Sequence, residues 1–345
     1  MKFSSMTGKK EVYVWDRVPL YEKVWKDAAT ELGAVFIELE KGFWKVTLGG
    51  RSTLICNHRV QIDDQVTLEM ASHKPLCYEL MKKKGLRIPE YAVYSLGDID
   101  IAADFIEKNK GPFVVKPAMG TSAGMGVTTH ISTFKECVGA SALASLYSER
   151  LMIERLVPGE SYRLLVLNGR MIHASRRRGV RLTGDGRSTL RQLMSNAGFK
   201  NRAWRGNSDR DLSATLQAQG LSEESIPSPG LGVLIKSIPD SRNIELRTVY
   251  DENVTNHICQ EIALQGERAA EALNSNFCGI DIITLDHTAP LEKTLGAVIE
   301  INTTPGLQHH YGLAFGDETS PAVEVLEYLL NSEAKNRSAA MSARR

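Results

Sequence analysis

The sequence predicts a mixed α+β or α/β fold, and two patterns along the chain lead to this prediction. Near the N-terminus a stretch with helical spacing, residues 20–32, lies between two short apolar runs at 12–15 and 34–39, as in a βαβ unit. In the middle of the chain, Asn168-Gly169 separates two strand-like runs. Both central residues of a type I′ turn need a positive φ, so this pair is the strongest hairpin signal in the sequence.

Composition and charge argue against several function classes. The chain has 345 residues, with 42 Lys and Arg against 41 Asp and Glu and a net charge of +1, which argues against a nucleic-acid partner or a membrane surface. No apolar run approaches the length of a membrane span, and the polar residues 1–11 do not form a signal peptide. The 5 cysteines are scattered without metal-site or redox spacing, so we expect a cytoplasmic protein.

A helix is predicted to begin in the stretch that contains Lys74. Ser72 is a fair N-cap and Pro75 is tolerated in a first turn, while Gly85 stands where the helix would stop. A lysine in the first turn interacts slightly unfavourably with the helix dipole. This slightly favours a functional reason for Lys74 over an ordinary surface lysine.

A glycine-rich loop follows a short buried strand that contains a lysine near its end. The strand at 112–117 carries Lys116, and the loop at 118–127 has small residues and three glycines that let backbone N–H groups approach an anion. No GK[ST] follows, so the loop is not a Walker motif. Such a loop is often only a flexible turn, but the lysine strand directly before it favours a phosphate site. Beyond it, Thr133 and Glu136 predict a capping box at a helix start.

Arginines gather on the predicted hairpin around Asn168-Gly169. Arg163 lies on its first strand, and three consecutive arginines end its second strand: Arg176, Arg177 and Arg178. A regular two-residue hairpin puts Arg176 and Arg178 on the face of Arg163. A β-bulge brings Arg177 to that face instead. An arginine fork binds carboxylates and phosphates through two hydrogen bonds, which suits an anionic substrate, although we expect at least one of the three to be solvated.

Two apolar runs near the C-terminus carry the oxygen ligands of a candidate metal site. In the strand that begins with the run at 297–301, Glu300 and Asn302 point to the same face because side chains alternate. If this strand pairs antiparallel with the run at 278–283, Asp281 joins them. Two carboxylates and an amide oxygen, without His or Cys, suit a hard cation such as Mg²⁺. The alternative is that the acids form structural salt bridges.

The stretch GIDII…AVIEINTTPGL resembles the metal-binding end of the ATP-grasp fold, and other segments agree with this resemblance in order. VVKP with its glycine-rich loop, LMIERLVPG, SYRL and GDGRST are similar to segments of the ATP-grasp region of cyanophycin synthetases, with D-alanine–D-alanine ligases more distant. The resemblance implies an N-terminal βα domain and two α+β subdomains that clamp ATP. The implied divisions are an N-terminal domain at 1–95, a small lid subdomain with the glycine-rich loop at 96–160, a C-terminal subdomain with the metal site at 161–331, and a polar tail at 332–345.

The resemblance also implies roles for residues. The implied nucleotide contacts are Lys74, Lys116, Gly120, Thr121, Ser122, Ala123, Gly124, Met125, Gly126, Glu154, Arg155, Val157, Glu160 and Ser161. The implied catalytic residues are Arg163, Arg177 and Lys236, and the implied ligands of Mg²⁺ or Mn²⁺ are Asp281, Glu300 and Asn302. Two departures from the family pattern stand out. Ser161 takes the position of the acid that holds the ribose, with Glu160 one residue early, and residues 239–245 replace a family segment near the acceptor.

By this resemblance the chain is expected to be an ATP-dependent carboxylate–amine ligase that forms a peptide or other amide bond through an acylphosphate, as stand-alone ligases of natural-product pathways do. Its partners would be small carboxylates and amines, such as amino acids or a peptide, and homodimers are common in the family. Two alternatives stay open. One is condensation of an amino acid onto a small scaffold to form an imine, as in mycosporine synthesis. The other is a non-catalytic ATP-binding regulatory module, against which the complete set of metal ligands argues.

Overall fold

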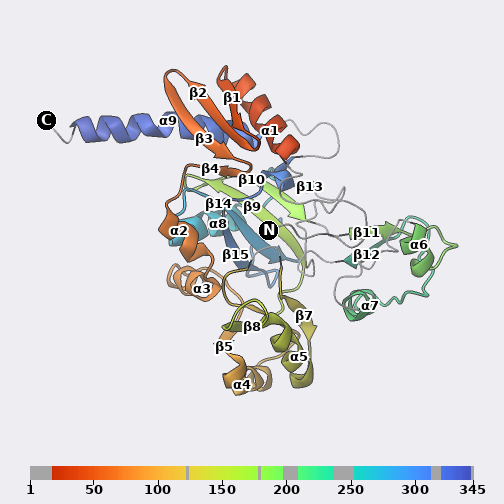
Figure 1. The fold of residues 1–345 in the computed structure, drawn as a ribbon. Helices are drawn as coiled ribbons and strands as arrows, with labels where there is room; N and C mark the ends of the chain where they lie inside the picture. Colours follow the sequence, from red (N-terminus) through yellow and green to blue (C-terminus); the bar gives the residue numbers. More distant parts are fainter. Residues whose placement is uncertain are drawn as a thin grey trace.

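A central antiparallel sheet organises the molecule (Figure 1). In this computed structural model the N-terminal sheet and the last helix lie on one side of the central sheet, a lid lies on the other, and a short arm extends sideways. The structure describes residues 18–121, 124–177, 180–196, 209–236, 252–311 and 320–342. The strand expected at 12–15 lies outside them. No helix in this described part is long and apolar enough to cross a membrane.

The N-terminal part packs one helix and an antiparallel meander against the last helix of the chain. Its elements are α1 (Val18–Glu31), β1 (Val35–Glu40), β2 (Phe43–Leu48), β3 (Arg51–Cys56), β4 (Arg59–Val60) and α9 (Pro321–Ser342). Trp25 of α1 and Trp44 of β2 are buried in one apolar core with Val325 and Leu326 of α9. The helix α9 extends into the polar tail expected at 332–345, because the good helix formers there continue the helical backbone to Ser342.

Two short helices connect this part to the lid, and they correct one predicted cap. They are α2 (Gln65–Ala71) and α3 (Lys74–Lys83). Ser72 is the C-cap of α2 and not the N-cap of α3, because its hydroxyl donates to Glu69 O at 2.7 Å. The N-cap of α3 is His73, which makes no side-chain cap bond. Gly85 adopts a φ of +72° just past α3, so the predicted helix stop is confirmed.

The lid is a four-stranded antiparallel sheet with two helices. Its elements are β5 (Tyr91–Tyr94), η2 (Leu96–Asp98), α4 (Asp100–Lys108), β6 (Phe113–Pro117), β7 (Thr128–Ile131), α5 (Phe134–Ala144) and β8 (Leu151–Arg155), with strand order β5-β8-β6-β7. The predicted capping box is confirmed, because Thr133 and Glu136 each bond the other's backbone N–H at the start of α5. The lysine strand β6 is completely buried, so its polar side chain must find partners inside the lid.

The central sheet carries the predicted hairpin and both predicted acid-bearing strands. Its strands are β9 (Glu160–Leu167), β10 (Arg170–Arg177), β13 (Glu252–Asn253), β14 (Phe277–Thr284) and β15 (Ala297–Thr303), in the order β13-β10-β9-β14-β15. Asn168 and Gly169 have φ of 49° and 74°, which confirms the turn. Helix α8 (Gln260–Leu273) covers one face, and a Cβ added at Gly266 would lie 2.7 Å from Leu164. Before this helix, Asn253 and Thr255 form a turn in which Asn253 Oδ1 accepts from the N–H and the hydroxyl of Thr255.

The arm is a two-stranded sheet with two helices and a small apolar core of its own. Its elements are β11 (Val180–Thr183), α6 (Leu190–Asn196), α7 (Asp209–Gln217) and β12 (Gly232–Lys236). The Thr189 hydroxyl accepts from the N–H of Gln192 in the first turn of α6, while the hydroxyl of Ser188 donates to Asp185.

Candidate active site

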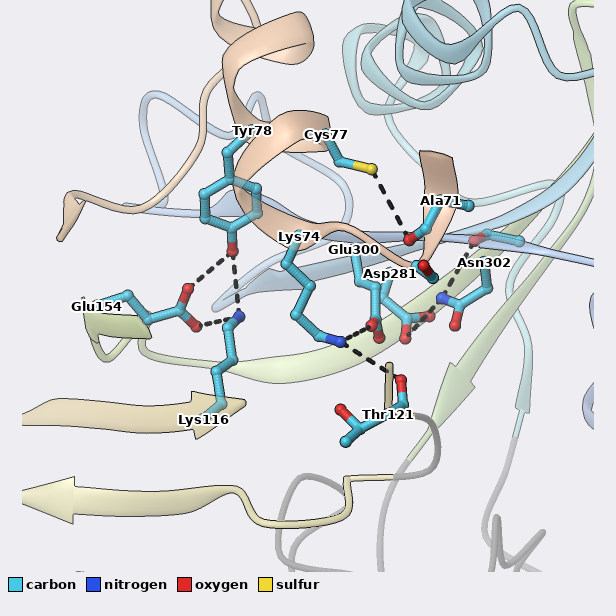
Figure 2. Close-up of polar contacts among 12 residues, drawn as sticks. Ala71, Lys74, Cys77, Tyr78, Lys116, Thr121, Glu154, Asp281, Glu300 and Asn302 are labelled. Carbon is cyan, nitrogen blue, oxygen red and sulfur yellow. Dashed lines mark hydrogen bonds and ion pairs between the residues drawn. The ribbon is translucent and has the colours of Figure 1, made fainter. Parts of the chain in front are cut away.

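The two acid-bearing strands pair as the sequence predicted. β14 and β15 are antiparallel, with Asp281 opposite Glu300 and Gly279 opposite Asn302. The Asn302 Nδ2 donates to Asp281 Oδ2 at 3.4 Å and to Gly279 O at 3.3 Å. The three predicted metal ligands therefore converge on one face of the sheet (Figure 2). Within the described residues no group of three or more His, Cys, Asp and Glu side chains forms a metal cluster, and this set contains only two acids.

Arg163 binds the central carboxylate of this set from the neighbouring strand. β9 pairs with β14 so that Arg163 lies opposite Asp281. Its Nε and Nη2 donate to Asp281 Oδ1 and Oδ2, each at 2.7 Å, which is the fork geometry of a strong charge-assisted pair. The arginine side chain is only 3% exposed. Sequence reasoning had placed both residues in the site but had not paired them.

A register irregularity in the hairpin decides which of the later arginines joins Arg163. The β9–β10 register shifts between Met171 and His173, so the predicted bulge is confirmed. Arg177 then lies on the face of Arg163, with its Nη1 3.5 Å from Asp281 Oδ2. Arg176 turns the other way and pairs with Glu160. Arg178 lies outside the part of the chain that the structure describes.

Lys74 contacts the second carboxylate from helix α3. Its Nζ lies 3.2 Å from Glu300 Oε1 and 3.5 Å from the backbone oxygen of Thr121 in the glycine-rich loop. We call the following set the sheet cluster: Lys74, Arg163, Arg177, Asp281, Glu300 and Asn302. Its three cations outnumber its two carboxylates by one, so the cluster carries a surplus positive charge that suits a phosphate.

A second, buried cluster lies in the lid. The Lys116 Nζ of β6 donates to Glu154 Oε1 of β8 at 2.8 Å, and the Tyr78 hydroxyl of α3 donates to Glu154 Oε2 at 2.8 Å. All three side chains are buried, and we call them the lid cluster. Burial and the Glu154 carboxylate raise the pKa of Tyr78 well above its ordinary value, so the hydroxyl keeps its proton. Sequence reasoning missed Tyr78, although its position one helical turn after Lys74 could have indicated it.

The strand that carries Glu154 and Arg155, both implied nucleotide contacts, uses two backbone N–H groups at its end for hydrogen bonds within the lid. The Arg155 N–H donates to Glu90 O and the Leu156 N–H donates to Pro112 O, each at 2.9 Å. The Arg155 side chain is exposed and pairs with Glu90 at 3.0 Å. A nucleotide at this strand therefore cannot accept from these two N–H groups unless it displaces those bonds.

Of the predicted ribose contacts, one faces the sheet cluster and one does not. Ser161 lies opposite Arg177 in the β9–β10 pair and so shares its face. The Glu160 carboxylate is paired with Arg176 and, at 3.0 Å, with Arg181 of the arm. Glu160 therefore anchors the arm to the sheet.

The glycine-rich loop keeps the backbone freedom expected of it. Gly120, Gly124 and Gly126 all have φ between 70° and 73°, a region that favours glycine. A Cβ at Gly126 would lie 2.8 Å from Pro117 and from Tyr147, so a side chain there would also collide. The other predicted site residues lie outside the part of the chain that the structure describes. They are Ser122, Ala123, the side chain of Lys236 and the segment 239–245.

The chain has the ATP-grasp fold, and its sequence is similar to ATP-grasp enzymes. A solved structure with the same fold is the bifunctional glutathione synthetase from Pasteurella multocida, with a TM-score of 0.58 and 17% identity over 92% of this chain and 44% of that one. No protein-family model matches the chain.

Among curated proteins, the chain is similar to two groups of larger enzymes. It is 27% identical over 283 residues to the cyanophycin synthetase of Crocosphaera subtropica, which covers 79% of this chain and 32% of that protein. It is 25% identical over 321 residues to the glutathione biosynthesis bifunctional protein GshAB of Listeria innocua, covering 89% of this chain and 40% of that protein. The chain thus spans well under half of the length of these relatives.

Proposed function

We propose that the chain is an ATP-dependent ligase that joins a carboxylate to an amine through an acylphosphate. The observation that carries this proposal is the sheet cluster, where Lys74, Arg163 and Arg177 surround the carboxylates of Asp281 and Glu300. A site for phosphates and a divalent cation needs this combination of cations and oxygen ligands. Similarity to cyanophycin synthetase and GshAB supports the same class of chemistry.

The chemistry of the donor set fits Mg²⁺ or Mn²⁺. Asp281, Glu300 and Asn302 offer carboxylate and amide oxygens, and hard cations prefer such ligands. Asn302 donates its amide N–H to Asp281, which leaves the amide oxygen for a cation. A cation held by these residues would offset the negative charge that develops on the phosphates.

In the first step, a substrate carboxylate oxygen attacks the γ-phosphorus of ATP, and ADP leaves with the electrons of the broken P–O bond. Lys74 and Lys116 would hold the phosphates, and the forks of Arg163 and Arg177 would bind the transferred phosphoryl group and the carboxylate. In the second step, an amine nitrogen attacks the acyl carbon, inorganic phosphate leaves, and the nitrogen gives up a proton. The product is an amide. In the imine alternative, the enol oxygen of a ketone on a small scaffold would be phosphorylated in place of a carboxylate, and the amine would add at that carbon and displace phosphate.

The test uses ATP, Mg²⁺ and hydroxylamine with pooled amino acids and small carboxylic acids. Hydroxylamine intercepts an acylphosphate without knowledge of the natural amine, so hydroxamate and ADP are both measured. We expect Glu300→Gln to lower turnover by at least about 10³-fold, because it removes one charge from the cation site. Glu324→Gln is the matched control, since Glu324 is also ion-paired but lies on α9.

The outcomes separate the proposal from its alternatives. A hydroxamate that forms in wild type and in Glu324→Gln, and is lost in Glu300→Gln, supports the ligase and identifies the carboxylate. If ATP binds but no ADP forms with any acid from the pool or from a cell extract, the result contradicts the ligase and favours the regulatory module. Steeply salt-dependent binding of nucleic acid would contradict both.

A further inference from the structure

One face of helix α3 contacts both clusters. Lys74 and Tyr78 are four residues apart, so their side chains lie on the same side of the helix. Lys74 reaches Glu300 in β15, while Tyr78 reaches Glu154 in β8 of the lid. Figure 2 shows Lys74 between the lid cluster and the acids of the sheet cluster, with Tyr78 on the lid side. The helix thus links the two ends of the proposed nucleotide site.

The lid cluster gives each oxygen of Glu154 its own donor. Lys116 takes Oε1 and the Tyr78 hydroxyl takes Oε2, both at 2.8 Å. The Lys116 ammonium also lies 5.3 Å from the centre of the Tyr78 ring and 3.4 Å from its hydroxyl. A buried carboxylate needs donors on both oxygens, so the hydroxyl leaves the ammonium committed to only one of them.

We propose that Tyr78 is a positioning residue for nucleotide binding: by bonding Glu154 Oε2 it fixes the ammonium of Lys116 on Oε1, where that ammonium meets the phosphates. The inference rests on the proposed function. Without the hydroxyl, Glu154 Oε2 has lost its donor, and the flexible Lys116 ammonium is the cation that can replace it. The ammonium would then be drawn onto both carboxylate oxygens and away from a phosphate.

This role predicts a loss in binding rather than in chemistry. Tyr78 bonds the lid cluster, while the residues proposed to bind the transferred group are Arg163 and Arg177 in the sheet cluster. Losing a hydrogen bond to a charged group corresponds to about tenfold in affinity. We therefore expect Tyr78→Phe to raise the Kd and KM for MgATP about tenfold and to change kcat by less than about twofold.

The experiment compares Tyr78→Phe with Tyr94→Phe. Tyr94 is also a buried tyrosine of the lid, and its hydroxyl forms a 2.7 Å hydrogen bond with Ser141. Tyr94→Phe therefore also removes a buried hydroxyl and its hydrogen bond, but it leaves the contacts of Lys116 unchanged. Calorimetric titration gives the Kd for ATP, ADP and adenosine, and thermal unfolding gives the stability of each variant. The expected result is weaker ATP and ADP binding in Tyr78→Phe, unchanged adenosine binding, and unchanged nucleotide binding in Tyr94→Phe.

A second variant, Glu154→Gln, shows whether weaker binding in Tyr78→Phe comes from the lost hydrogen bond or from a disturbed fold. Glu154→Gln keeps the shape of the residue and removes the charge that Tyr78 and Lys116 share. In the Glu154→Gln background, adding Tyr78→Phe is expected to weaken ATP binding by less than about twofold, because the two changes act on one interaction. Equal ATP affinity in wild type and Tyr78→Phe overturns the positioning role, as do additive losses in the double variant. Absence of ATP binding in wild type overturns the proposed function itself.

Discussion

The Lys116–Glu154 pair of the lid cluster and the Lys74–Glu300 pair of the sheet cluster are the same kind of ion pair in different environments. In the lid, Lys116 and Glu154 are 6% and 5% exposed, and Tyr78 completes the hydrogen bonding of the carboxylate. In the sheet, Glu300 is 30% exposed, and Lys74 is its ion-pair partner. The comparison teaches that the buried pair holds its groups in place, whereas Glu300 can exchange Lys74 for a ligand, because water compensates for the charge of its partly exposed carboxylate during the exchange.

The largest change in stability is expected from Lys116→Met. The variant leaves the Glu154 carboxylate buried without its cation, and breaking a buried pair in this way costs about 3–5 kcal/mol of unfolding free energy. Urea unfolding followed by circular dichroism measures the change as a lower midpoint at unchanged slope. A loss below about 1 kcal/mol would mean that water reaches Glu154, and the contrast between the clusters would disappear.

The matched change in the sheet cluster, Lys74→Met, is expected to cost less than about 1 kcal/mol. Glu300 is nearly a third exposed, so solvent screens the charge that the variant leaves behind. Nucleotide binding should nevertheless weaken in both lysine variants, which separates binding from stability. The same urea experiment measures stability, and titration with ADP measures binding. Equal destabilisation by the two lysine variants would break the comparison.

The smallest effect is expected at Asp185 in the arm, a carboxylate held by neutral donors. The N–H groups of Ser188 and Arg187 and the Ser188 hydroxyl lower the pKa of Asp185 to about 2. A carboxyl pKa below the unfolded value of about 3.9 contributes stability above that pH, and the contribution is lost as the pH falls toward 2. Asp185→Asn should therefore lower the unfolding midpoint at neutral pH and make no difference near pH 2. A variant effect that persists unchanged at low pH would contradict this sign.

Sequence reasoning reached the strands of the site and the residues that converge there, but not the ion pairs among them. Alternation along a strand placed Glu300 and Asn302 on one face. A regular hairpin would have favoured Arg176 and Arg178, and the family resemblance, which a bulge reconciles with the hairpin, favoured Arg177. The fork of Arg163 on Asp281 depends on which strand lies beside β14, and strand order is a tertiary property. The residue pattern of a single strand does not indicate which strand lies beside it.

Local signals also failed where two elements compete for one residue. Ser72 reads as an N-cap in isolation, but α2 ends immediately before it and takes its hydroxyl. Tyr78 reads as an ordinary core residue of an amphipathic helix, and only the packing of α3 against the lid gives its hydroxyl a carboxylate. Glu160, one residue before the position of the family's ribose acid, is paired with the arginines of the sheet and the arm, and the sequence does not show this pairing.

The packing of α1 against α9 has a consequence for how the chain is made. The apolar core of the lid draws only on residues between 92 and 153, so it can form as soon as that stretch leaves the ribosome. The N-terminal core needs α1 and also α9, which begins at residue 321. At about 5–20 residues per second, α1 and its meander wait on the order of tens of seconds for their partner. During synthesis this N-terminal part is therefore made before the lid but completed after it.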